Sequence, residues 1–296
     1  MNAIPKRKFG QTGLEVTILG LGGVQVGNSQ VSEKEAERFL NSVLDAGINL
    51  IDTARGYGLS EERIGKYLSN RRDEFILSTK VGYDVEGYSD WTKETVTAGI
   101  DRALRLLRTD MLDIVHLHSC ELETLQNGGV LEALDQAHKA GKVRVAAYSG
   151  ENEALDFAIS SGLIQSIQLS VNPCDQGCID KGLARATEAN LGVIAKRPVA
   201  NIFWRFSEQP TGNYAEEYWV RARAMQLDPG KLSWQEFTLR FATYTPGVHT
   251  SIVGTSSLKH LHENIDAVAK GPLPPEIYAS TRATYKKHDQ NWTVQV

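Results

Sequence analysis

Short apolar runs alternate along this chain with longer segments in which apolar residues recur at helical spacing. The short runs predict buried strands, which we expect at residues 18–22, 49–53, 75–80, 111–118, 142–148, 164–170, 192–196 and 249–254. The segments between them predict helices, and Ser32 with Glu35 has the spacing of a capping box at the first of these. Such alternation indicates a closed parallel barrel or a doubly wound sheet, and the number of strands favours the (β/α)8 TIM barrel.

The same pattern predicts one domain over residues 1–296. A β-hairpin is expected over residues 6–18, because two short strand-like runs flank a turn. The barrel is expected over residues 18–270 and a C-terminal tail over residues 271–296. Barrels of this class have roughly 250 residues, so the chain has room for one barrel with these additions.

Two aromatic-rich stretches interrupt the alternation, residues 200–234 and the tail. Long excursions around a barrel usually form substrate walls or covers. Trp204, Trp219 and Trp292 are the candidates for such walls. The alternative, that these aromatic side chains only pack against the outer helices, stays open.

Composition narrows the class of protein. Apolar residues make up 41% of the chain and charged residues 23%, which are values of a globular protein with a sizeable core. The net charge of −4, with basic residues scattered, argues against nucleic acid as a partner. The sequence contains neither an apolar run long enough to cross a membrane nor the apolar core of a signal peptide, so we expect a cytoplasmic protein without a membrane partner. Cys174 and Cys178 lack a second pair of ligands nearby in the sequence, so we expect no metal site.

Four polar residues stand at or just past the ends of successive predicted strands: Asp52, Tyr57, Lys80 and His118. The carboxyl ends of barrel strands are where active sites form. A phenol is a poor proton donor at neutral pH, and a nearby ammonium makes it a better one. Lys80 can be that ammonium, Asp52 can keep it charged, and a neutral His118 can orient a substrate oxygen.

These roles fit the reduction of a carbonyl group, with a hydride from a cofactor and a proton from Tyr57. Each of the four residues alone would more often be structural, as a turn, packing or surface residue. Their joint occurrence on consecutive strand ends carries the hypothesis. His116 shares the side-chain direction of His118, and we expect it to point into the barrel one layer deeper.

The motifs around these residues resemble the aldo-keto reductase family. They are residues 52–61, residues 78–81, residues 112–118, residues 141–144 and residues 254–264. The resemblance implies a (β/α)8 barrel that reduces aldehydes and ketones with NADPH, less often NADH. It also implies Tyr57 as proton donor, Lys80 and Asp52 as the pair that tunes it, and His118 as the orienting residue.

The resemblance further implies a set of cofactor contacts. Ser149 and Gln168 match residues that hold the nicotinamide amide, whereas Gly150 stands where the family has Asn. Lys196 stands where the family usually has a Tyr that stacks on the nicotinamide, and its aliphatic stem could cover the ring instead. Further contacts are implied for Asp52 itself, for the loop after the first strand and for the residues after Lys196: Gly22, Gly23, Val24, Gln25, Arg197, Pro198 and Val199.

The phosphate end of the cofactor is implied for residues 254–264. Gly254, Thr255 and Ser256 lead into the last barrel helix, whose first backbone N–H groups can bind an anion. Ser257 and His260 stand where many members have an Arg for the 2′-phosphate, and Lys259 is a nearby substitute. Glu263 and Asn264 complete the implied set. We expect NADP, with NAD as the alternative, and a small carbonyl compound as the substrate.

Two other functions stay open. A Schiff-base lyase could use Lys80 or Lys196, which both lie at strand ends, although Asp52 should keep the Lys80 amine protonated. A nicotinamide-sensing regulatory subunit with little turnover would need the same cofactor site.

Overall fold

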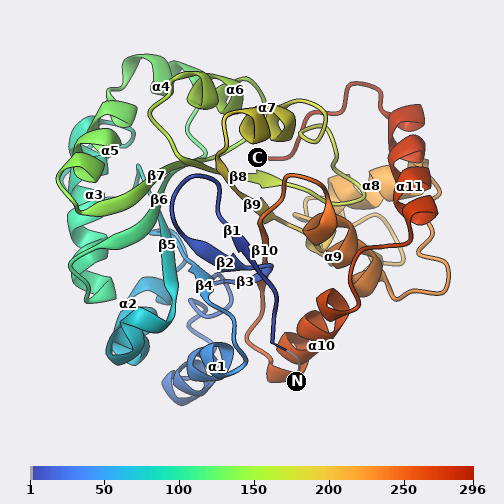
Figure 1. Ribbon diagram of the computed structural model, residues 1–296, viewed down its shortest axis with the longest axis horizontal. Helices are drawn as coiled ribbons and strands as arrows, with labels where there is room; N and C mark the ends of the chain where they lie inside the picture. The colour runs from blue at the N-terminus through green and yellow to red at the C-terminus, as the bar shows by residue number, and fades with distance from the viewer. Residues whose placement is uncertain (1–2) are drawn as a thin grey trace.

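A closed barrel of parallel strands forms the centre of the molecule (Figure 1). The computed structural model describes residues 3–296. The barrel strands are β3 (Leu19–Gly22), β4 (Leu50–Asp52), β5 (Ile76–Val81), β6 (Leu112–His118), β7 (Val143–Ser149), β8 (Ser166–Ser170), β9 (Gly192–Lys196) and β10 (Thr250–Gly254). Pairing of β10 with β3 closes the ring. The predicted barrel is confirmed, and every strand begins and ends within two residues of its expected bounds.

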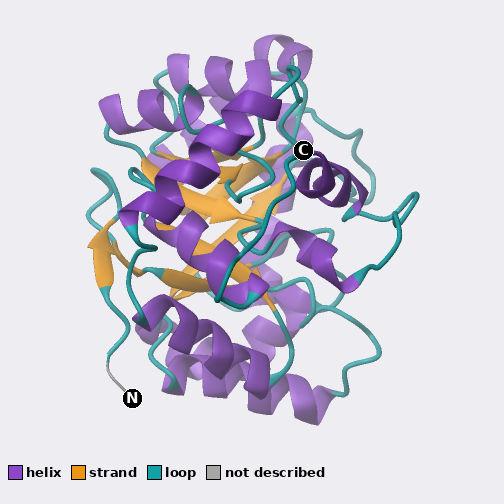
Figure 2. Ribbon diagram, turned by 90° about the vertical axis from the view of Figure 1, so that its right-hand side faces the viewer, coloured by secondary structure: helices purple, strands orange, loops and turns teal. Residues whose placement is uncertain are grey.

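Helices follow the strands and form an outer layer around them (Figure 2). They are α1 (Glu33–Asp45), α2 (Ser60–Leu68), α3 (Lys93–Leu107), α4 (Leu122–Asn127), α5 (Val130–Lys139), α6 (Asn152–Ser160), α7 (Gly182–Glu188), α8 (Glu216–Ala224), α9 (Trp234–Tyr244), α10 (Leu258–Ala269) and α11 (Pro275–His288). Two short 3-10 helices cover Ser69–Glu74 and Ala200–Arg205. The predicted capping box is present at α1, where the Ser32 side chain accepts from the Glu35 N–H and Glu35 bonds back to the Ser32 N–H.

The N-terminal hairpin closes one end of the barrel. Its strands β1 (Lys6–Lys8) and β2 (Glu15–Thr17) pair antiparallel, as predicted. Phe9, in the turn, is fully buried in a cluster with barrel-lining residues such as Leu50 and Ile194. Gly192 makes room for it, because a Cβ at that position would lie 2.4 Å from the Phe9 ring. The hairpin therefore plugs the barrel with an aromatic side chain.

Aromatic side chains of the two aromatic-rich stretches pack in one cluster. Trp204 stacks on Trp234 with ring centroids 6.0 Å apart, and Trp292 meets Tyr285 edge to face. Trp219 packs against the same cluster, which lies beside α8, α9 and α11. The three tryptophans considered as substrate walls thus pack in an aromatic cluster.

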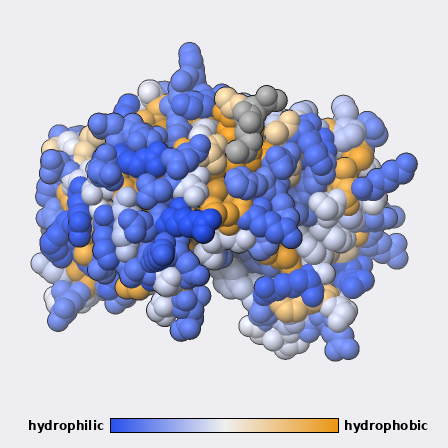
Figure 3. Space-filling model, turned by 90° about the horizontal axis from the view of Figure 1, so that it is seen from below, coloured by the Kyte–Doolittle hydropathy of each residue, from blue (hydrophilic) through white to orange (hydrophobic). Residues whose placement is uncertain are grey.

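The face in Figure 3 is mostly hydrophilic, with hydrophobic atoms in small separate groups. Within residues 3–296, no helix combines the length and the apolar character that a membrane span requires.

Candidate active site

The register of the barrel brings three of the four predicted residues together, and Tyr57 follows on the loop after β4. Asp52 pairs with Ser78, Lys80 pairs with His116, and His118 pairs with Ser149. Because alternate residues of a strand point to the same side, Lys80 shares the side of Ser78 and His118 shares the side of His116. This side is the barrel interior, where these strands contribute buried polar side chains.

Asp52 and Lys80 form a buried ion pair. Their Oδ2 and Nζ atoms are 2.5 Å apart, and each side chain is 1% exposed. Lys80 Nζ also donates to the Thr53 carbonyl at 2.8 Å. Oδ1 of Asp52 accepts from Ser78 Oγ at 2.8 Å and from Gln168 Nε2 at 3.1 Å. Both charges therefore have hydrogen-bond partners, which a buried pair needs in order to persist.

The balance of burial and charge keeps Lys80 protonated. Burial alone would lower the pKa of its ammonium. The Asp52 carboxylate, with a smaller contribution from Tyr57, outweighs burial and raises the Lys80 pKa above its ordinary value. A stable cation therefore lies at the end of β5.

Tyr57 lies next to this cation. Lys80 Nζ is 4.9 Å from the centroid of the Tyr57 ring. The loop after β4 fixes the Tyr57 backbone, whose N–H donates to the Ala54 carbonyl at 3.1 Å. Gly27 packs directly on this loop, since a Cβ there would lie 1.7 Å from the Tyr57 carbonyl oxygen. The phenol is thus held on a rigid turn beside the ammonium.

His118 also lies beside the Tyr57 ring. The two rings lie edge to face, with centroids 6.0 Å apart. Burial, followed by the positive charges of Lys80 and Lys196, lowers the pKa of His118 to about 2. The imidazole is therefore neutral at physiological pH. His116 is fully buried one layer deeper, and burial with the Lys80 charge lowers its pKa as well.

Sequence reasoning missed three residues of this region. Ser78 bonds to Asp52, as described above. Tyr83, just after β5, approaches Nδ1 of His118 to 3.0 Å through its hydroxyl. Glu151 lies 3.3 Å from Lys196 Nζ and accepts the Ser170 N–H at 2.7 Å. Only the register and the loop geometry reveal these contacts, although Tyr83 is three residues from Lys80 in the sequence.

The residues expected to hold the nicotinamide amide lie beside Asp52. Ser149 Oγ donates to Gln168 Oε1 at 3.0 Å, and Gln168 Nε2 donates in turn to Asp52 Oδ1. Lys196 is nearly buried, so its stem is inside the barrel mouth and its ammonium meets Glu151. Burial lowers the pKa of Lys196 and raises that of Glu151, so burial favours the neutral form of both partners.

The loops expected near the cofactor phosphates also meet. The Gln25 side chain lies against Gly254, because a Cβ on that glycine would lie 2.1 Å from Gln25 Oε1. Thr255 Oγ1 accepts the Ser257 N–H at 3.0 Å, and Ser257 caps α10. Gly22 pairs with Gly254 in the barrel, which brings the loop of Gly23 and Val24 to the same place. A capped helix start beside small residues can bind an anionic group.

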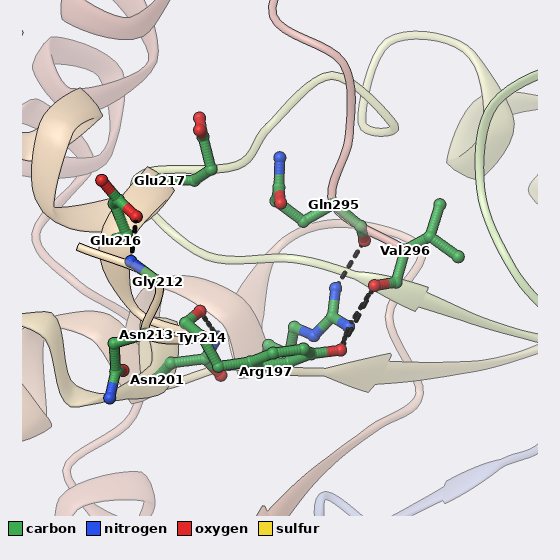
Figure 4. A pocket seen from close by; sticks show the side chains of 9 residues that line it. All are labelled: Arg197, Asn201, Gly212, Asn213, Tyr214, Glu216, Glu217, Gln295 and Val296. Carbon is green, nitrogen blue, oxygen red and sulfur yellow. Dashed lines mark hydrogen bonds between the residues drawn. The ribbon is translucent and has the colours of Figure 1, made fainter. Parts of the chain in front are cut away.

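The remaining expected cofactor residues are spread around this edge. His260 and Glu263 are exposed on α10, whereas Asn264 is buried and its Oδ1 accepts from Gln235 at 2.6 Å. Pro198 and Val199 follow β9. Arg197 points to the tail, where it donates to the carbonyl oxygens of Gln295 at 2.5 Å and Val296 at 2.6 Å (Figure 4).

The cysteines show no sign of a metal site. Cys120, Cys174 and Cys178 are free and buried. Residues 3–296 contain no group of His, Cys, Asp and Glu side chains arranged to hold a metal ion.

Comparison with known proteins agrees with this geometry. The model of the Aldo/keto reductase family matches residues 18–286. The uncharacterized oxidoreductase YqkF of Bacillus subtilis is 29% identical, over 92% of this chain and 93% of that protein. L-galactose dehydrogenase of Arabidopsis thaliana is 27% identical, over 91% of this chain and 90% of that enzyme.

A solved structure agrees as well. The holo form of the aldo-keto reductase AKR11C1 from Bacillus halodurans matches with a TM-score of 0.84 and 27% identity, covering 95% of this chain and 96% of that one. The sequence, the closed barrel and the polar group at its mouth lead to one assignment: the chain belongs to the aldo/keto reductase family of carbonyl-reducing oxidoreductases.

Proposed function

We propose that this protein reduces aldehydes or ketones to alcohols with a nicotinamide cofactor and uses Tyr57 as the general acid. The observation that carries the proposal is the buried Asp52–Lys80 ion pair, whose ammonium is 4.9 Å from the Tyr57 ring centroid. Neutral His118 faces the same ring. A cation, a phenol and a neutral imidazole at one barrel mouth are the groups that carbonyl reduction requires.

Each residue has a separate task in this proposal. A nicotinamide cofactor, when bound, would supply the hydride that the carbonyl carbon accepts. The Tyr57 hydroxyl gives its proton to the carbonyl oxygen as negative charge develops there. The Lys80 ammonium stabilises the phenolate that remains, and Asp52 keeps that ammonium charged. His118 donates a hydrogen bond that orients the substrate oxygen.

The raised pKa of Lys80 argues against a Schiff-base lyase that uses this amine. A lysine nucleophile must lose its proton, and Asp52 holds that proton in place. Borohydride treatment with a carbonyl substrate should therefore leave Lys80 unmodified.

We propose NADP as the preferred cofactor, with NAD as the alternative. Ser149 and Gln168 would hold the nicotinamide amide, since both are polar, buried and adjacent to Asp52. The start of α10 would hold the phosphates through its backbone N–H groups. Lys259, exposed on the first turn of that helix, would attract the 2′-phosphate.

The substrate is proposed to be a small carbonyl compound, and sugars belong in the first panel. L-galactose dehydrogenase and D-threo-aldose 1-dehydrogenase are among the relatives of this chain, at 27% and 28% identity. Aldehydes, ketones and aldoses should be tested with each cofactor, in both directions. A protein that binds the cofactor and turns over none of these compounds would instead be a nicotinamide-sensing subunit.

Tyr57→Phe is the central test. Loss of the general acid should lower kcat for carbonyl reduction by about 10²- to 10⁴-fold. Cofactor affinity, measured by quenching of protein fluorescence, should stay nearly unchanged. Tyr88→Phe is the matched control, because Tyr88 is 49% exposed and outside the group described above. Turnover retained by Tyr57→Phe would assign the proton to another donor.

A further inference from the structure

We infer that Tyr83 is a positioning residue that sets the tautomer of His118, so that Nε2 of the imidazole carries the proton offered to the substrate oxygen. The inference rests on the proposed function, because it concerns how His118 performs its orienting task. Nothing in the family motifs of this sequence pointed to Tyr83.

The contact is direct. The Tyr83 hydroxyl oxygen is 3.0 Å from Nδ1 of His118, within the range of a good hydrogen bond. The two rings are tilted by 34°, with centroids 5.5 Å apart. Because Nδ1 is engaged by Tyr83, Nε2 is the ring nitrogen left for a substrate.

The loop after β5 holds Tyr83 in this place. The Trp91 ring packs on the Tyr83 ring with centroids 5.6 Å apart, and the backbone N–H of Trp91 donates to the Gly82 carbonyl at 2.7 Å. Gly82 has a φ of 132°, and a Cβ there would collide with the Trp91 ring. Arg55 and Asp84 form an ion pair at 2.9 Å, which ties this loop to the loop of Tyr57. The hydroxyl therefore has a defined position.

Gly56 provides the space into which the hydroxyl fits. A Cβ on Gly56 would lie 2.6 Å from the Tyr83 hydroxyl oxygen but 3.4 Å from the next ring atom, Cζ. The collision of an alanine would thus be mainly with the hydroxyl itself. The turn that carries Tyr57 therefore leaves room, at Gly56, for the Tyr83 hydroxyl that contacts His118.

The direction of the proton follows from the chemistry of the two groups. A neutral imidazole has one donor and one acceptor nitrogen. Burial lowers the pKa of His118 to about 2 and raises that of Tyr83, so both groups are neutral at pH 7. A phenol is the stronger proton donor of the two, and an imidazole nitrogen is more basic than a phenol oxygen. Tyr83 therefore donates to Nδ1, which leaves the imidazole proton on Nε2.

The consequence for the reaction is specific. A His118 ring whose Nε2 lacked its proton could only repel a developing alkoxide. Removing the Tyr83 hydroxyl allows both tautomers and frees the ring to rotate. We expect kcat to fall by about tenfold, less than in Tyr57→Phe, since a partner that orients a functional histidine typically has an effect of this size.

The test compares the wild type, Tyr83→Phe and the control Tyr88→Phe by NMR of protein labelled with 15N-histidine. The His118 signal is identified by its loss in His118→Gln. Couplings between ring protons and nitrogens should show the single Nε2–H tautomer in the wild type and in Tyr88→Phe. In Tyr83→Phe they should show a mixture of tautomers, with kcat lowered and cofactor affinity unchanged.

A second variant, Gly56→Ala, disturbs the contact between the Tyr83 hydroxyl and His118 without changing either residue. It should produce the same change in the His118 signal by displacing the Tyr83 hydroxyl, and it should add nothing in a Tyr83→Phe background. An Nδ1–H tautomer in the wild type, or an unchanged His118 signal in Tyr83→Phe, would overturn the inference. The NMR result does not depend on turnover, so a protein inactive on every carbonyl would disprove the proposed reduction and leave the tautomer result standing.

Discussion

At the scale of single residues, two neighbouring basic groups have different charge states, although burial disfavours the charged form of both. Burial lowers the pKa of both Lys80 and His118. Lys80 has the Asp52 carboxylate 2.5 Å away and stays charged. His118 has the Tyr83 phenol instead and additionally feels the charge of Lys80, so it becomes neutral. One carboxylate thus decides which base is the cation and which is the neutral hydrogen-bond donor.

The low pKa of His118 predicts a measurable loss of stability in acid. Above pH 6.5, the ordinary value, the ring is neutral in the folded and the unfolded chain. As the pH falls from 6.5 towards the folded value of about 2, only the unfolded chain binds the proton, so the free energy of unfolding decreases. Between pH 7 and pH 5 the wild type should therefore lose about 2 kcal/mol more than His118→Gln, which cannot take up the proton.

Chemical denaturation of both proteins at the two pH values measures this difference. His260→Gln is the matched control, because His260 is exposed on α10, and it should behave as the wild type does. Equal losses in the wild type and His118→Gln would mean that the folded protein accepts the proton on His118.

At the scale of elements, the strands were predictable and their contacts were not. Each barrel strand is a short apolar run between polar segments, so hydrophobic pattern alone locates it, as for β9 at residues 192–196. Parallel strands place their carboxyl ends together, so Asp52, Lys80 and His118 could be grouped from their order. The contact of Gln168 with Asp52 could not, because it depends on which residues face each other across the closed ring.

The aromatic stretches show the limit of the same reasoning. From the sequence alone, a tryptophan such as Trp204 could equally well line a substrate wall or pack in an aromatic cluster. Only the three-dimensional position of α9 reveals that Trp204 stacks on Trp234. Long excursions carry no periodic pattern that fixes their direction, so their packing partners stay undetermined until the fold is known.

The hairpin illustrates an element whose role depends on one side chain. Phe9→Ala should lower the free energy of unfolding by about 3–5 kcal/mol, because it leaves a cavity at the plugged end of the barrel. Lys8→Ala, one residue earlier and exposed, should change it little. Thermal and denaturant unfolding measure both. A small effect of Phe9→Ala would show that the barrel interior is stable without its plug.

At the scale of the whole molecule, the last residues return to the barrel mouth and are fixed there. Arg197, at the end of β9, donates to the Gln295 and Val296 carbonyls and to the Tyr214 hydroxyl (Figure 4). These residues line a cavity of about 260 Å³. Ser170, at the end of β8, donates to Gln295 as well. The segment is thus held at the carboxyl ends of β8 and β9.

A buried ion pair anchors the start of this segment, and it supplies the last prediction. Arg221 on α8 lies 3.3 Å from Asp175 and donates to the Thr293 carbonyl at 2.7 Å, while Asp175 accepts the Gln295 N–H at 3.1 Å. Arg221→Met leaves the Asp175 carboxyl buried without its partner, so the free energy of unfolding should fall, by about 3–5 kcal/mol where that carboxyl is ionised. The amide of Gln295 should exchange faster with deuterium, because its acceptor is no longer held.

The loss in Arg221→Met should also depend on pH in a defined direction. Burial raises the pKa of Asp175 to about 7, and the Arg221 charge acts against that rise. Between the unfolded value of 3.8 and the folded value, the folded chain holds the extra proton, so stability decreases as the pH rises. Removing Arg221 moves the folded pKa higher and extends this window upward. The variant should therefore lose more stability at pH 8 than at pH 6.

The double variant Asp175→Asn/Arg221→Met separates charge from packing. It removes both buried charges, so it should recover most of the lost stability, and its free energy of unfolding should lack the decrease between pH 6 and pH 8 that Asp175 gives the wild type. If the double variant were as unstable as Arg221→Met at both pH values, packing of the Arg221 side chain over Trp292, rather than the ion pair, would anchor the segment. In that case the hydrogen exchange of Gln295 should follow Trp292→Ala more closely than Asp175→Asn.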